Sequence, residues 1–238
     1  VDLVSPDGPG TGYELPPPTL EAIELALRIG SRGGAEVLFL NVMPEEDDVP
    51  GNPLAVAQLE QLIAEARQRG VQAASSKIVA GKAWVEIIRE VLRGGHDLVL
   101  VGSRHHRTRA LLLGTTDTKL LRKCPCPVWV ARPEISAGVP VVMVADDLTP
   151  VGEHCVQLAV SAAQLLDARL LVVHGVQYPL ENSLRRTGCP EEEIERHKQE
   201  EQDRARQILQ SHLDHTDHRT LTGGVMIEIK AGPPGGGW

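Results

Sequence analysis

Short runs of branched apolar residues alternate along the chain with longer segments whose apolar residues recur every three or four positions. The runs predict strands at residues 36–42, 71–79, 98–101, 128–131, 139–145, 168–174 and 225–230, and residues 1–4 resemble the tail of one more. The longer segments predict helices at residues 19–29, 53–69, 83–93, 115–123, 151–167 and 190–213. Apolar strands separated by helices are typical of an α/β fold, an open parallel sheet with helices on both faces.

This order of elements repeats within the chain. Ala35–Leu40 resembles Ala168–Val173, and Ile78–Gly81 resembles Ile229–Gly232. We therefore expect a first domain at residues 1–133 and a partial second copy at residues 134–238, truncated after its third strand. The strand near Val141 would be central in a complete sheet, so here we expect it to become an edge with an unpaired row of backbone groups.

The stretch from residue 97 to 133 carries the main candidate site. A strand ends at Gly102, and a basic loop follows that contains Arg104, His105 and Arg107. Gly114 then opens a short helix, with Thr115 or Thr116 as its expected N-cap. A loop at the carboxyl end of a parallel strand, followed by a helix N-terminus, favours an anion, most simply phosphate.

Composition and charge narrow the classes of function. The net charge of −8 argues against nucleic acid as a partner, because nucleic-acid binding needs a broad basic face. No apolar run is long enough to predict a membrane span. No signal sequence is apparent, so we expect a cytoplasmic protein.

Three segments together resemble the universal stress protein family in its tandem, two-domain form. The most specific is GSRHHRTRALLLGTTDTKLLRKCPCPVWVARP at residues 102–133. The others are AGKAWVEIIREVLRGGHDLVLVG at residues 80–102 and VVMVADDLTP at residues 141–150. The resemblance covers the first copy almost fully and the first half of the second, and it implies a parallel five-stranded α/β fold.

The resemblance also implies a site, because nucleotide-binding members hold ATP in a crevice at the carboxyl edge of the sheet. Gly102 and Gly114 fall on the first and last glycines of the family's loop, and Thr115 falls on its Ser/Thr. His105 replaces the second glycine of that motif, and the spacer that follows is one residue short. The strand-end aspartate corresponds to Asp147 in the second copy and to Asp2 in the first, and Val42 falls near the position beside the base.

The sequence leads to several hypotheses about function. The chain is expected to be a stress-response regulatory protein that binds a ligand or a partner and is not an enzyme. The alternatives are an ATP-binding module with at most slow hydrolysis, and a degenerate scaffold without ligand. A homodimer through the strand at Val128–Ala131 is also expected, as tandem members pair their copies through the last strands.

Two further clusters have competing interpretations. His212, His215 and His218 are spaced three apart, which suggests either a metal site or a polar helix end. Cys124 and Cys126 form a C-x-C at a helix-to-strand junction and are interpreted as packing residues rather than a redox pair.

Overall fold

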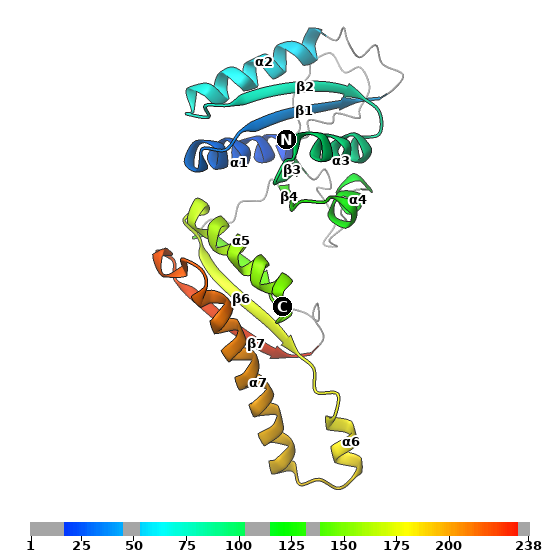
Figure 1. The fold of residues 1–238 in the computed structure, drawn as a ribbon, viewed down its shortest axis with the longest axis vertical. Coiled ribbons are helices and arrows are strands. Elements are labelled where there is room, and N and C mark those ends of the chain that lie inside the picture. The colour runs from blue at the N-terminus through cyan, green and yellow to red at the C-terminus, as the bar shows by residue number, and fades with distance from the viewer. Residues whose placement is uncertain (1–16, 45–52, 103–114, 132–138, 233–238) are drawn as a thin grey trace. The chain divides into compact units, whose positions relative to one another are not determined.

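The computed structural model describes residues 17–44, 53–102, 115–131 and 139–232 (Figure 1). The chain divides into two compact units, Val1–Ile135 and Ser136–Trp238, and each is described by itself. No helix within the described ranges is long and apolar enough to cross a membrane.

The first unit alternates helices and parallel strands, as the sequence predicts. Its elements are α1 (Pro17–Gly33), β1 (Val37–Met43), α2 (Pro53–Gln68), β2 (Ala74–Ala80), α3 (Ala83–Gly94), β3 (Val99–Gly102), α4 (Thr115–Lys123) and β4 (Val128–Ala131). β1 pairs with β2, and β3 pairs with β4, both in parallel. These described strands form two separate pairs instead of the single five-stranded sheet that was predicted, and the predicted strand at residues 1–4 lies outside the described residues.

Helices cover both faces of the first unit's strands. Residues of α1 and α2 pack with Val37 and Phe39 of β1 in one cluster of buried side chains. Residues of α3 and α4 pack with Leu40 and Val42 of β1 in another cluster. Alternate residues of one strand therefore point into two apolar cores, which explains why the strand sequences lack a polar face.

The second unit is a three-stranded parallel sheet in the order β5-β6-β7. Its elements are β5 (Val141–Ala145), α5 (Pro150–Leu166), β6 (Arg169–Val176), α6 (Glu181–Arg186), α7 (Glu191–Asp214), a 3₁₀ turn (His218–Thr220) and β7 (Val225–Ala231). One core joins α5, α7 and the sheet, and it includes the fully buried Leu170, Val172 and Leu209.

The opposite face of this sheet has no helix over it among the described residues. Val141, Met143 and Met226 on that face are 55%, 53% and 54% exposed. β5 lies at one end of the strand order, which agrees with the expectation that it becomes an edge.

The repeat seen in the sequence has a counterpart in backbone hydrogen bonds. The N–H of Val37 donates to the carbonyl of Ala73, and the N–H of Leu170 donates to the carbonyl of Gly224. At the other strand end, Gly81 N–H donates to Met43, and Gly232 N–H donates to Val176. Gly81 and Gly232 have φ angles of 143° and 135°, which an L side chain rarely adopts, so both turns depend on glycine.

Most elements differ from the sequence prediction by one or two residues at an end, and a few differ by more. β2 begins three residues late, because the N–H of Val71 bonds to the carbonyl of Ala66 and its buried side chain closes the end of α2. α1 extends beyond the predicted helix at both ends, and α6 was not predicted. α4 begins at Thr115, so Thr116 lies inside its first turn and is not an N-cap.

Candidate functional site

The candidate site of the first unit lies at the carboxyl edge of its strands. Gly102 is the last residue of β3 and pairs with Ala131, the last residue of β4. Thr115 begins α4. The structure therefore fixes both ends of the loop between them. Four of the predicted site residues in and around that loop, Arg104, His105, Arg107 and Gly114, lie outside the described residues, as does Asp2.

The short helix α4 is held by its inward face. Leu120 is fully buried, and Asp117 in the first turn is 6% exposed. A carboxylate there complements the partial positive charge of a helix N-terminus.

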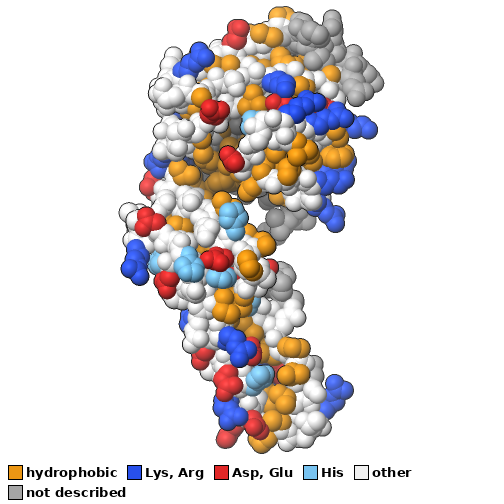
Figure 2. Space-filling model, viewed as in Figure 1, with side chains coloured by type: hydrophobic (Ala, Val, Ile, Leu, Met, Phe, Trp, Pro, Cys, Tyr) orange, Lys and Arg blue, Asp and Glu red, His pale blue; other side chains and the backbone are white. Residues whose placement is uncertain are grey.

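The basic residues of α4 turn toward a tryptophan of α3. The Nζ atoms of Lys119 and Lys123 lie 5.2 Å and 4.9 Å from the ring centroid of Trp84. Such cation–π contacts connect the two helices. Figure 2 shows Lys and Arg side chains gathered over this part of the first unit. Lys119 and Lys123 are therefore directed to Trp84.

The side chain of Val42 does not lie where it could contact a nucleotide base. Its side chain is 3% exposed and packs in the cluster with Leu40 and Ile87. The amide of Val37 points toward β2, so strict alternation directs the backbone N–H and C=O of Val42 away from β2. The side chain of Val42 is therefore part of the core, and its backbone groups face the side of β1 opposite to β2.

The corresponding strand end in the second unit is closed by its own hydrogen bonds. The Oδ1 atom of Asp147 accepts from the backbone N–H of Thr149 at 3.1 Å and from its hydroxyl at 2.6 Å. These bonds, the hydroxyl's above all, lower the pKa of Asp147. The Thr149 hydroxyl also accepts from the amides of Val151 and Gly152, which makes it the N-cap of α5. Asp147 is thus near the expected edge, but its carboxylate is already engaged.

A second carboxylate, Asp146, is buried beside this turn and was not predicted. Its Oδ2 atom lies 2.7 Å from Nδ1 of His212 on α7, and its Oδ1 accepts from Leu148 N–H at 2.7 Å. Its side chain is 0% exposed, against 10% for His212. The sequence did carry a signal for this placement. Side chains alternate between the two faces of a strand, so Asp146 lies on the same face as Val142 and Val144, the face that α5 and α7 cover.

Gly152 makes room for this carboxylate. A Cβ atom at that position would lie 2.2 Å from the Asp146 Oδ1 and 2.8 Å from the Asp147 Oδ1. The first turn of α5 therefore packs directly on the two acidic side chains. Leu148, which lies between Asp147 and Thr149, has a φ of 62°, a conformation that is uncommon for a leucine.

A sequence model described as the universal stress protein family matches residues 11–132, more than half of the chain. The chain belongs to the universal stress protein family. A 47-residue segment, 19% of the chain, is 53% identical to universal stress protein E of Escherichia coli K12, and the match spans 15% of that protein.

Two solved structures resemble this universal stress protein over nearly all its length. A protein of unknown function, PA1789 from Pseudomonas aeruginosa, has a TM-score of 0.61 at 22% identity. The match covers 94% of this chain and 72% of the PA1789 chain. A universal stress protein from Archaeoglobus fulgidus has a TM-score of 0.62 at 16% identity. That match covers 91% of this chain and 75% of the Archaeoglobus chain. At these identities the likeness shows the fold alone.

The three histidines near the end of α7 do not converge in this universal stress protein. His212 bonds to Asp146, while His215 Nδ1 lies 2.8 Å from Oε1 of Glu153 and His218 Nδ1 lies 2.8 Å from the carbonyl of Leu213. No group of three or more metal-binding side chains occurs among the described residues. The three histidines therefore have separate partners, and two of the three connect α7 to the β5–α5 segment.

Cys124 and Cys126 lie close together between α4 and β4. Their sulfur atoms are 3.7 Å apart and both side chains are partly buried. Burial, and then the neighbouring thiol of Cys124, raise the pKa of Cys126 to about 12. A thiol with that pKa is almost wholly protonated near neutral pH, which fits a packing role and not a reactive one.

Proposed function

We propose that this universal stress protein is a cytoplasmic stress-response regulator that binds a nucleotide, with ATP as the best candidate, at the carboxyl edge of its first unit. The observation that carries the proposal is the strand–loop–helix from β3 to α4. Gly102 and Thr115 anchor a twelve-residue loop, residues 103–114, at the edge where open α/β sheets bind ligands. The family relationship supports the same location.

The charge of the loop supports a phosphate-bearing ligand. The segment contains Arg104, Arg107 and Arg109 and no acidic residue, in a chain with a net charge of −8. Arginine pairs with phosphate through two parallel hydrogen bonds, and such charge-assisted bonds are the strong ones. The lysines of α4 contact Trp84, so the loop arginines are the proposed phosphate ligands.

The proposal assigns little catalysis to the site. The described part of this edge presents Gly102, a buried Val42 and the partly buried Thr116, none of which is a general base. Turnover of bound ATP is therefore proposed to be slow at most, with the bound state as the functional output.

A second candidate function is contact with a protein partner through the second unit. We infer that residues 139–232 are a partial second copy, because its strand ends repeat the hydrogen bonds of the first unit. Val141, Met143 and Met226 form an apolar area on its sheet face that a partner would bury. Pairing of β4 with the β4 of a second chain remains the proposed route to a homodimer.

Calorimetry of the full chain with ATP and Mg²⁺ tests the nucleotide proposal. Replacing Arg104 and Arg107 with alanine should weaken binding by about 1–3 kcal/mol for each charge-assisted bond removed. Arg93→Ala serves as the matched control, because Arg93 is an exposed arginine in the last turn of α3, at the opposite end of the strands.

Two results would contradict the assignment. ATP that binds the double variant as tightly as the parent would move the site away from the loop. The absence of any binding heat or competition, with either ATP or ADP, would leave the scaffold alternative as the better account.

A further inference from the structure

The outer surface of α3 and α4 in the first unit separates basic from acidic side chains. The acidic residues of both helices turn inward: the side chains of Glu86 and Glu90 are 12% and 13% exposed, and Asp117 is buried. The exposed charged residues among the described residues of this surface are all basic, and they are Lys82, Arg89, Arg93, Lys119, Arg122 and Lys123. We call these six residues, together with the exposed Leu92, the α3–α4 basic face.

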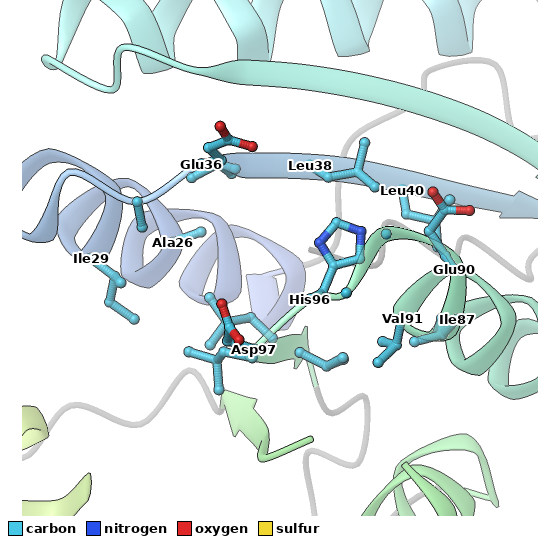
Figure 3. A pocket seen from close by; sticks show the side chains of 17 residues that line it. Ala26, Ile29, Glu36, Leu38, Leu40, Ile87, Glu90, Val91, His96 and Asp97 are labelled. Carbon is cyan, nitrogen blue, oxygen red and sulfur yellow. The ribbon is translucent and has the colours of Figure 1, made fainter. Parts of the chain in front are cut away.

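One side of α3 faces the interior of the first unit, and the other side carries its cations. Ile87, Glu90 and Val91 line a cavity of about 370 Å³, and Figure 3 shows their side chains around it. Arg89 and Arg93 are four positions apart, so they share one side of the helix, and both are exposed. The helix therefore presents its acid to the interior and its arginines to solvent.

The basic face also contains apolar area. Leu92 follows Arg89 by three residues, which makes the two neighbours on the helix surface, and it is 68% exposed. Trp84, Val85 and Ile88 of the same helix are only partly buried. Figure 2 shows apolar side chains bordered by Lys and Arg on this part of the first unit. The face thus combines cations with apolar groups and is more than a solvated charged surface.

Trp84 holds two of the cations on this face. The Nζ atoms of Lys119 and Lys123 lie 5.2 Å and 4.9 Å from its ring centroid. Neither lysine forms an ion pair with the described residues, and neither do Arg93 and Arg122. Tryptophan has an apolar ring and one N–H donor, and such side chains favour the boundary between an apolar phase and water. The carbon stems of the lysines can lie along an apolar surface while their ammonium groups reach charged partners.

This chemistry fits an anionic phospholipid surface better than a folded protein partner. The chain has a net charge of −8, so a local face without exposed acids attracts negative charge as the rest of the chain does not. A bilayer offers phosphates across a plane, so cations from two helices find acceptors without a matched carboxylate for each. It also offers acyl chains below the phosphates for Leu92 and the edge of Trp84. A contact of this kind needs no membrane-spanning helix.

We propose that the α3–α4 basic face is a peripheral membrane-binding surface that docks on anionic phospholipid. The six cations bind lipid phosphates, and Leu92 enters the boundary between the headgroups and the acyl chains. Binding weakens as salt is raised, because salt screens exposed charges. The arginine loop of the proposed nucleotide site is not part of this face, so the two proposals can fail separately.

Vesicle flotation with the full chain tests the proposal. Two preparations are compared, one of phosphatidylcholine alone and one of equal parts phosphatidylcholine and phosphatidylglycerol. The protein should float with the anionic vesicles and stay in solution with the neutral ones. Raised salt should release it from the anionic vesicles.

Two exposed arginines provide a variant that weakens the face without disturbing the core. Arg93→Gln combined with Arg122→Gln should lower partitioning into anionic vesicles at least tenfold, because each cation near an anionic surface contributes to binding. The control combines Arg67→Gln with Arg206→Gln. It removes the same charge from exposed arginines of α2 and α7 and should change partitioning less than about twofold.

A second pair of variants tests the apolar part of the face. Leu92→Ser should lower partitioning into anionic vesicles at least threefold, because it removes the group that enters the boundary with the acyl chains. Leu54→Ser is the control, since Leu54 lies on α2 and is 60% exposed. Both leucines are exposed, so neither change should alter thermal unfolding.

Four outcomes would overturn the proposal. The first is equal flotation with neutral and anionic vesicles, or flotation with neither. The second is equal binding by the Arg93/Arg122 variant and its control. The third is an equal loss of binding when Arg104 and Arg107 are replaced with alanine, which would assign the contact to the loop. The fourth is binding to soluble polyglutamate without binding to vesicles, which would make an acidic protein the partner.

Discussion

The two units contain the same kind of parallel strands but differ in how their faces are covered. In the first, α1 and α2 pack on one side and α3 and α4 on the other, so that Phe39 is fully buried and Leu40 is 5% exposed on opposite faces of β1. In the second, both α5 and α7 pack on one side, and Val141 and Met143 on the other side are more than half exposed. α5 and α7 occupy the face that corresponds to that of α1 and α2, so the difference lies in α3 and α4, which have no counterpart among the described residues of the second unit.

The strand ends differ in the same way. In the second unit the turn after β5 satisfies its polar groups internally, through Asp146, Asp147 and Thr149. In the first unit the loop after β3 leads from a glycine to a helix N-terminus and contains arginines in place of acids. The proposed anionic ligand therefore belongs to the first unit, whereas the second has a turn fixed by its own side chains.

The largest expected effect concerns the internal polar contact of the second unit. His212→Leu should lower the stability of that unit by about 3 kcal/mol, because it leaves the Oδ2 atom of the buried Asp146 without its hydrogen-bond partner. His215→Leu, on the same helix, removes a pair in which the histidine side chain is 62% exposed and should cost less than about 1 kcal/mol. The urea dependence of hydrogen exchange in peptides from α5 and β6 measures both.

Equal losses in the two histidine variants would contradict this part of the account. They would mean that the Asp146–His212 contact contributes no more than an exposed pair, and that α7 is held on the sheet by apolar packing alone.

An intermediate effect tests the uncovered face directly. Val172→Ala should destabilise the second unit by about 2 kcal/mol, because Val172 is fully buried under the helices. Val141→Ala makes the same change on the opposite face, where the side chain is 55% exposed, and should change stability by less than about 0.5 kcal/mol. A large loss in the second variant would show that something covers that face in solution.

The smallest effect is a pH dependence in the first unit. The guanidinium of Arg69 lies 2.6 Å from both carboxylate oxygens of Glu24, and their hydrogen bond lowers the pKa of Glu24. A lowered pKa means that the pair stabilises the folded state above the ordinary pKa of 4.5 and that this stability is lost as the pH falls through the folded value.

Both partners of this pair are more than a third exposed, so the effect is limited by solvent screening. Glu24→Gln should cost less than about 1 kcal/mol at pH 7, and the cost should shrink as the pH falls below 4.5, measured by urea unfolding followed by tryptophan fluorescence. Glu60→Gln, an exposed residue of α2, is the control. A difference between Glu24→Gln and the parent that grows toward acid pH would have the wrong sign.

The order of elements could be predicted from the sequence, because strand runs and helical periodicity are local signals. β4 was predicted to the residue, since Pro127 precedes it and a short apolar run defines it. The start of β2 was missed because Val71, apolar and branched like a strand residue, closes a helix instead. α6 was missed because it is a six-residue helix between turns and has too short an apolar period to detect.

The site was predictable only in part. The sequence indicates the loop and its glycines, but the role of Asp146 depends on contact with His212, 66 residues away. The structure also places two lysines of α4 on Trp84 of another helix. Contacts between elements of this kind are not encoded in any local pattern.

Hydrogen exchange of the full chain with and without ATP and Mg²⁺ tests the central claim most directly, because it reports on both units in one experiment. We predict slower exchange in peptides that cover residues 99–102 and 115–120, at the ends of the arginine loop, and no change in the turn at residues 146–152. Slower exchange centred on the second unit, or no change in the first at saturating ATP, would contradict the claim.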